Sequence, residues 1–334
     1  MPLGWYLAQG FIPVVPYDSD DEEGPCRLPD GRLVCGPHGF VVCGRCCSDY
    51  SFMEDVLSHG EDEDEDDVLD AETEAMYREL GPEARAEIDS RWGPPQSPRS
   101  LFVGAHTVST REPDAPAKRR GIGRVFPTRF IPSTSNATLT ELFPGTATSR
   151  SLSRYIHRLD PRKVLILTDG ACLNNGMPNP KSGWAFVHGP GLTGQPALIA
   201  SGRLEYQGPF GDPSIQSSNR AELRAVIAAL RFRDWTADGF NTVVIATDSE
   251  YVTAGSTAWA RSWVRNGWRT AGKGDVKNKD LWEMLLGEVE RLDEEGLSIQ
   301  FWRISRDLNQ VADAAAKKAA AEDELRDEWT DAGI

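Results

Sequence analysis

The 334-residue sequence predicts an α/β protein whose second half forms a mixed sheet flanked by helices. Three observations predict this class. Short apolar runs bounded by turn residues recur between residues 160 and 322, stretches with helical apolar spacing separate the later runs, and an acidic residue directly follows two of the runs. The first half lacks this regularity, so we expect the folded domain to begin near residue 160.

Five runs are predicted to be strands. The first, residues 164–169, is continuously apolar until a final aspartate, which is typical of a strand buried on both faces. Residues 183–188 and 197–206 follow at Gly/Pro turns, which predicts an antiparallel meander. Residues 242–247 and 298–304 come after helical stretches, so we expect parallel crossovers there.

Helical spacing predicts three main helices in the same half. The first opens at Asn219, with Glu222 three residues later as its capping-box partner. The second covers about residues 280–294, and the last is capped by Asn309 and contains Asp313.

Four acids occupy comparable places in this pattern, namely Asp169, Glu222, Asp248 and Asp313. Each has an ordinary explanation: a turn former, a capping-box partner, the N-cap of the next helix and an i,i+4 ion pair with Lys317. Together these explanations require four coincidences at strand ends and helix starts that converge on one spot. A carboxylate cluster repels itself unless a divalent cation binds, so we expect a metal site.

A basic segment, residues 259–279, combines evenly spaced cations with tryptophans, of which Trp259 is the first. Because side chains one helical turn apart share a face, at least the first three cations are predicted to form one surface. Only Asp275 dilutes the positive charge, so we favour contact with nucleic-acid phosphates over a solvated amphipathic helix. The predicted contact residues are Arg261, Trp263, Arg265, Trp268, Arg269, Lys273 and Lys277.

The net charge of −15 would by itself argue against binding nucleic acid. Residues 160–322, however, hold 19 Lys/Arg and 20 Asp/Glu. The acidic excess therefore lies outside the half that carries the four acids and the basic segment.

Residues 1–60 contain five of the six cysteines. The spacing Cys-x2-His-x4-Cys-x2-Cys predicts a small module with a tetrahedral zinc site, structural or partner-binding in role. The alternative is a set of reduced thiols around residues 40–42, with Cys26 or Cys47 as competing ligands. The predicted zinc ligands are Cys35, His38, Cys43 and Cys46.

The rest of the chain is predicted to contain an acidic segment and disordered linker over residues 61–160, with a short helix near residues 71–92. A catalytic domain is expected at residues 161–322 and an acidic tail at 323–334. No run is long enough to cross a membrane and no signal peptide is recognisable, so we expect an intracellular chain, cytoplasmic or nuclear, without membrane contact.

Five blocks, TDGACLNNG, SNRAEL, ATDSEY, NGWRTAGKGDVKNKDLW and LNQVADAAAK, resemble in order and spacing the signature blocks of type 1 ribonuclease H. This family cuts the RNA strand of RNA/DNA hybrids. The resemblance covers about residues 160–322 and implies the ribonuclease H fold, a five-stranded mixed sheet flanked by helices. Nothing before about Pro161 resembles the family or its N-terminal hybrid-binding domain. We therefore expect a eukaryotic, fungal-type member with an unrelated Cys/His-rich extension.

The resemblance implies a two-metal mechanism with Mg²⁺, or with Mn²⁺ in its place, and products with 5′-phosphate and 3′-hydroxyl ends. Asp169 would bridge both ions, Asp313 would hold the ion that activates water, and Glu222 and Asp248 would hold the ion at the leaving 3′-oxygen. Glu222 and backbone groups after Asp169 would also read the RNA 2′-hydroxyls. The hybrid-binding positions carried over from the family are Gly170, Ala171, Cys172, Asn175 and Asn219.

One departure from the family concerns the loop before the last helix. Many members have a histidine there, but this sequence has no histidine after His188. Arg306 is the substitute we expect to neutralise phosphate charge, although an arginine cannot shuttle a proton. Two alternatives are a weak or inactive hybrid-binding protein and a related nuclease acting on another nucleic acid. We also expect a monomer, with a protein partner for the N-terminal module.

Overall fold

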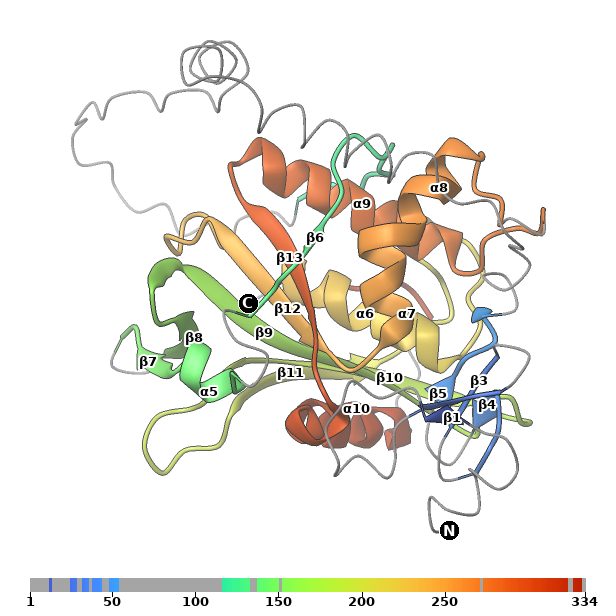
Figure 1. The fold of residues 1–334 in the computed structure, drawn as a ribbon, viewed down its shortest axis with the longest axis horizontal. Helices are drawn as coiled ribbons and strands as arrows, with labels where there is room; N and C mark the ends of the chain where they lie inside the picture. The colour runs from blue at the N-terminus through green and yellow to red at the C-terminus, as the bar shows by residue number, and fades with distance from the viewer. Residues whose placement is uncertain are drawn as a thin grey trace. The chain divides into compact units, whose positions relative to one another are not determined.

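The computed structural model describes residues 12–13, 25–28, 32–35, 38–43, 48–53, 116–132, 137–149, 152–270, 273–323 and 327–331 (Figure 1). All of them belong to one compact unit made of residues 1–58 and 115–334. The acidic segment after residue 60 and the helix predicted near residues 71–92 lie outside the described residues.

Five strands form the predicted mixed sheet. In sequence they are β9 (Asp160–Leu173), β10 (Lys181–Gly189), β11 (Leu198–Arg203), β12 (Thr242–Thr247) and β13 (Ser298–Arg303). Their spatial order is β11-β10-β9-β12-β13. Strands β9, β10 and β11 pair antiparallel, whereas β12 pairs parallel with both β9 and β13. The predicted order of hairpins first and crossovers afterwards is confirmed.

Helices cover both faces of this sheet (Figure 1). Helices α6 (Ser218–Arg231) and α9 (Lys279–Glu294) lie on one face, and α10 (Gln310–Ala321) lies on the other. The apolar stripe of α6 is fully buried in the core, as its helical spacing predicts. A further helical stretch after β12 consists of α7 (Glu250–Ala254), the π-helix η1 (Gly255–Trp259) and α8 (Ala260–Arg265).

The starts of two helices differ from the prediction. Ser217 is the N-cap of α6, where its hydroxyl accepts from the Arg220 backbone N–H at 3.3 Å, so the capping box at Asn219 is wrong. Ser249 is the N-cap of α7 and accepts from the Val252 backbone N–H. Neither Glu222 nor Asp248 therefore serves as a helix cap, and their carboxylates remain available for another role.

The prediction of a disordered linker up to residue 160 is wrong for its described part. Strand β6 (Thr128–Arg129) pairs parallel with β13, and β8 (Ser153–His157) pairs antiparallel with β9. Helix α5 (Leu139–Leu142) and strand β7 (Gly145–Ala147) lie between them. Isolated aromatic residues such as Phe130 and Phe143 bury themselves against Trp302. Because they occur singly, they produce no periodic pattern in the sequence.

The N-terminal module contains two small sheets. Strands β1 (Ile12–Pro13), β2 (Pro25–Arg27) and β3 (Leu33–Cys35) form one sheet, and β4 (Val42–Cys43) pairs with β5 (Ser48–Asp49) in the other. Residues 327–331 near the C-terminus pack back on α6, where the Trp329 ring lies 3.9 Å from the Arg224 guanidinium carbon.

Candidate active site

Two of the four acids lie at the same level of the sheet because of strand register. The last pair between the parallel strands β9 and β12 is Leu167 with Ala246. Asp169 and Asp248 each lie two residues further along. The prediction that Asp169 ends its strand is wrong, because β9 continues to Leu173 in register with β10. Asp248 follows directly after β12. The two acids therefore lie just beyond the point where β12 stops pairing with β9.

Glu222 reaches the same place from α6. Strand β9 and α6 approach each other so closely that a Cβ at Gly170 would lie 2.1 Å from the Glu222 backbone nitrogen. Only glycine allows this approach. Asp169, Glu222 and Asp248 each offer a carboxylate oxygen, and these three atoms all lie within 4.8 Å of one another.

Two of the three carboxylates are buried, with Asp169 5% and Glu222 9% exposed, and Asp248 is partly buried. Burial raises the pKa of Asp169 well above its usual value, and the charges of Asp248 and Asp313 raise it further. Burial also raises the pKa of Glu222, with additional repulsion from Asp169 and Asp248. Among the described residues, no donor reaches the buried Oε2 atom of Glu222. The cluster therefore has the oxygen donors and the uncompensated charge that suit a hard divalent cation.

Asp313, the fourth predicted acid, lies in the first turn of α10. Its carboxylate accepts from the Lys317 ammonium at 2.8 Å, which is the i,i+4 ion pair that its spacing predicts. Its charge raises the pKa of Asp169, so it belongs to the same electrostatic environment. The three-carboxylate group does not include it.

Two side chains from the loop before α10 hold Asp248. Arg306, in the 3-10 helix η2 (Arg306–Leu308), donates from Nε to Asp248 Oδ2 at 3.0 Å. Asn309 donates from Nδ2 to Asp248 Oδ1 at 2.8 Å and to the Thr168 carbonyl at 3.0 Å. Asn309 occupies the N-cap position but makes no side-chain cap bond. The hydrogen bonds of Asn309 to the site were not predicted from the sequence, because an asparagine directly before a helix predicts a helix cap.

The predicted hybrid-binding positions after Asp169 offer backbone rather than side chains. Ala171 and Cys172 are 1% and 0% exposed, and both pair with β10. Asn219 lies at the start of α6, and its Nδ2 donates to the Asp49 carbonyl of the N-terminal module at 3.1 Å. Asn175 is buried in the turn after β9.

The basic segment is helical only in its first part. Helix α8 ends at Arg265, because Gly267 and Trp268 both adopt positive φ and the Trp268 N–H turns back to the Trp263 carbonyl. The prediction that Arg269 shares a helical face with Arg261 is therefore wrong. The five predicted cations are nevertheless all exposed, as contact with phosphates requires, and they are Arg261, Arg265, Arg269, Lys273 and Lys277.

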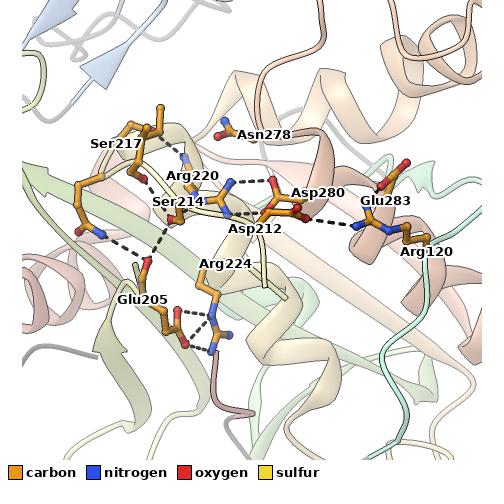
Figure 2. Close-up of polar contacts among 12 residues, drawn as sticks. Arg120, Glu205, Asp212, Ser214, Ser217, Arg220, Arg224, Asn278, Asp280 and Glu283 are labelled. Atoms are coloured by element: carbon orange, nitrogen blue, oxygen red, sulfur yellow. Dashed lines mark hydrogen bonds and ion pairs between the residues drawn. The ribbon is translucent and has the colours of Figure 1, made fainter. Parts of the chain in front are cut away.

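A network of buried arginines on α6 connects the helix that carries Glu222 with the end of the basic segment (Figure 2). Arg220 donates to Asp280 at 2.8 Å and to the Ser214 hydroxyl at 2.7 Å. One turn later, Arg224 forms a fully buried ion pair with Glu205. The first pair joins the start of α6, which carries Asn219 and Glu222, to the start of α9 directly after the basic segment.

Comparisons with known proteins agree with this architecture. The family model described as RNase H matches residues 161–321. Ribonuclease H of Treponema pallidum is 40% identical over 167 residues, which cover 47% of this chain and 90% of that protein. Ribonuclease H of Nitrobacter hamburgensis is 42% identical and is covered over 68% of its length by 36% of this chain. The crystal structure of RNase H1 from Halobacterium salinarum is 25% identical, covering 47% of this chain and 93% of that chain, with a TM-score of 0.29.

The chain belongs to the ribonuclease H family. It is therefore a ribonuclease H enzyme, and the predicted fold and enzyme class are confirmed. The two ribonuclease H sequences are bacterial, and the expected fungal-type origin and type 1 subclass stay predictions. Strands β6, β7 and β8 lie before the matched range, yet they extend the sheet of the ribonuclease H domain. Among the described residues, no helix is long and apolar enough to cross a membrane.

Proposed function

We propose that this ribonuclease H hydrolyses the RNA strand of RNA/DNA hybrids with two bound divalent cations, leaving 5′-phosphate and 3′-hydroxyl ends. The observation that carries the proposal is the convergence of the buried Asp169 and Glu222 carboxylates and the partly buried Asp248 carboxylate within 4.8 Å. Buried charges of one sign are costly unless a counter-charge is present. Membership of the family supports the choice of substrate.

The donor set suits Mg²⁺ or Mn²⁺, because all three donors are carboxylate oxygens. When two such ions are bound, they supply a deprotonated water and neutralise charge on the leaving oxygen. In this proposal Asp169, Glu222 and Asp248 would hold the ions, and Asp313 would contribute to the one that activates water.

Arg306 has a supporting role in the proposal. Attraction to Asp248 outweighs the effect of burial and raises the pKa of the Arg306 guanidinium, so the side chain keeps its proton throughout the working pH range. It cannot act as a general base. It donates to one oxygen of Asp248 while Asn309 donates to the other, and its positive charge lies beside the carboxylate cluster.

Hybrid recognition is divided between two surfaces in this proposal. Backbone groups of residues 170–172 and the side chains of Asn175, Asn219 and Glu222 would contact the RNA strand, whose 2′-hydroxyls distinguish it from DNA. The exposed cations of the basic segment would contact the phosphates of the DNA strand. Phosphate contacts supply affinity and orientation without sequence choice.

The test is cleavage of an end-labelled RNA/DNA hybrid by the full chain in Mg²⁺, beside double-stranded RNA, duplex DNA and single strands. We expect cleavage of the hybrid alone, on its RNA strand. Asp169→Asn should abolish it, whereas the matched control Asp293→Asn, which changes an exposed aspartate on α9, should retain it. Cleavage of another substrate at a similar rate, or an active Asp169→Asn variant, would contradict the proposal.

A further inference from the structure

The N-terminal module brings three side chains with soft donor atoms together. The donor atoms of Cys35, His38 and Cys43 all lie within 4.8 Å of one another, and the Cys43 sulfur lies 3.5 Å from His38 Nδ1. Cys35 and Cys43 are 1% and 2% exposed. They come from the ends of two different strands, β3 and β4, so the cluster joins the two small sheets of the module.

The backbone around Cys35 is shaped for a ligand turn. The Cys35 N–H donates to the Phe40 carbonyl at 2.9 Å, and the Gly39 N–H donates to the Cys35 carbonyl at 2.7 Å. Gly39 has a φ of +70°, which favours glycine and closes the turn. The Phe40 N–H then points at the Cys35 sulfur at 3.5 Å. A backbone donor directed at sulfur stabilises a thiolate, the form of cysteine that binds metal.

Packing alone does not explain this arrangement. The alternative predicted from the sequence was a set of thiols in an apolar pocket around residues 40–42. Phe40 is instead 58% exposed, and Val41 and Val42 are only partly buried. Two buried cysteines and a half-buried histidine therefore bring their donor atoms together at one point, and the exposed Phe40 does not enclose them in an apolar pocket.

We infer that Cys35, His38 and Cys43 bind a zinc ion in the N-terminal module. Thiolate and imidazole donors at this spacing suit zinc, in contrast to the carboxylate oxygens of the active site. The fourth ligand predicted from the sequence, Cys46, lies outside the described residues.

The ion would also have a consequence for the nuclease, which depends on the proposed function. Directly after β5, residues 49–53 lie on the candidate nucleic-acid surface: Asp49 accepts from Asn219, and the Lys277 ammonium donates to the Ser51 hydroxyl at 3.3 Å. The Phe52 ring is buried and lies 5.3 Å from the rings of both Tyr251 and Trp259.

The same module reaches the turn that follows Asn175. A Cβ built on Gly176 would lie 2.9 Å from a methyl carbon of Val42 in β4. The module thus contacts the candidate surface at α6, at this turn and at the basic segment. Zinc would hold β4 and β5, and through them the segment at residues 49–53, in place over groups that a hybrid would need.

Metal analysis of the full chain tests the inference without depending on cleavage. We expect one zinc per chain after expression in zinc-supplemented medium and dialysis. Cys172→Ser, which changes a buried thiol of the ribonuclease H domain, should keep it, and Cys35→Ser with Cys43→Ser should lose it. Replacement by Co²⁺ should give the visible absorption of tetrahedral thiolate coordination in the wild type only. A wild-type chain without zinc, or a double variant that keeps it, would overturn the inference.

Hydrogen–deuterium exchange provides the second measurement. In the double variant we expect faster exchange in α7 and η1 than in wild-type protein, because Phe52 no longer stays packed on Tyr251 and Trp259. Unchanged exchange there, together with loss of zinc, would show that the ion does not hold the segment on the nuclease surface and would overturn that part of the inference. If cleavage fails but zinc is bound, only the proposed function is contradicted.

Discussion

The molecule contains two clusters of candidate metal ligands whose construction is opposite. In the ribonuclease H domain, three carboxylates converge from different elements of one rigid core. In the N-terminal module, two cysteines and a histidine converge across strands of only two or three residues. The first cluster is positioned before any ion arrives, at an electrostatic cost. In the second, the ion itself would supply cohesion that so small a core lacks.

The largest effect expected from this difference is on catalysis. Glu222→Gln removes a donor from the carboxylate cluster and should lower kcat by about 10³-fold or more, since bound cations contribute several kcal/mol to the barrier. Cys43→Ser removes a donor from the other cluster and should lower kcat by less than about fivefold, since it does not touch the reacting atoms. Steady-state cleavage of the hybrid in Mg²⁺ compares the two. Equal losses would mean that the clusters are not independent.

A smaller effect is expected from the group that positions Asp248. Asn309→Ala should lower kcat by roughly 10- to 100-fold and weaken the response to Mg²⁺, as is usual when a hydrogen-bond partner of a metal ligand is lost. The exposed neighbour Gln310→Ala is the matched control and should leave both unchanged. A Mg²⁺ titration of the cleavage rate distinguishes weaker binding from a general loss of activity. An Asn309→Ala variant with a normal titration would show that Arg306 alone suffices.

The cost of assembling the carboxylate cluster can be measured as stability. The pKa of Asp169 is raised in the folded state, so the folded protein binds this proton more tightly than the unfolded chain does. The free energy of unfolding therefore falls as pH rises from the usual carboxyl pKa through the raised value. Asp169→Asn should therefore raise the free energy of unfolding by roughly 1–3 kcal/mol at pH 8 without divalent cations. The gain should shrink towards pH 4. Urea unfolding across this range measures it, and Asp293→Asn should show no such trend.

The smallest expected effect concerns the contact between the two regions. Phe52→Ala should lower the KM for the hybrid about two- to tenfold with kcat unchanged, because substrate no longer displaces a ring packed on Tyr251 and Trp259. Phe40→Ala changes an exposed phenylalanine of the same module and serves as the control. Zinc content should be unaffected in both variants. A raised KM would show instead that the segment helps to bind the hybrid.

The sequence predicted the rigid region better than the irregular ones. Strand β12 has the predicted bounds, because a short, β-branched apolar run between turn residues is typical of a buried strand. The predicted end of β9 was wrong, because small residues after Asp169 continue the strand beneath the closely packed helix α6. The ordered part of the linker was also missed, because Phe130 and Phe143 are buried one at a time.

The candidate site shows the same limit. The acids could be found because their positions relative to strands and helices recur, and the carboxylates of Asp169, Glu222 and Asp248 lie within 4.8 Å of one another. The hydrogen bonds of Asn309 could not be found, because asparagine before a helix is equally consistent with a cap. The contact of residues 49–53 with the basic segment joins positions more than 200 residues apart, for which spacing carries no signal.

The packing of residues 329–331 on α6 has a consequence for the order in which the domain is made. Arg231 pairs with Glu288 and Asp331, and Arg224 donates to the Thr330 carbonyl at 2.6 Å. Helix α6 leaves the ribosome about a hundred residues before the last of these partners. Until then, the arginines of α6 must stay hydrated or pair with other acidic residues. The nascent domain therefore forms its last ion pairs only when residues 329–331 have emerged.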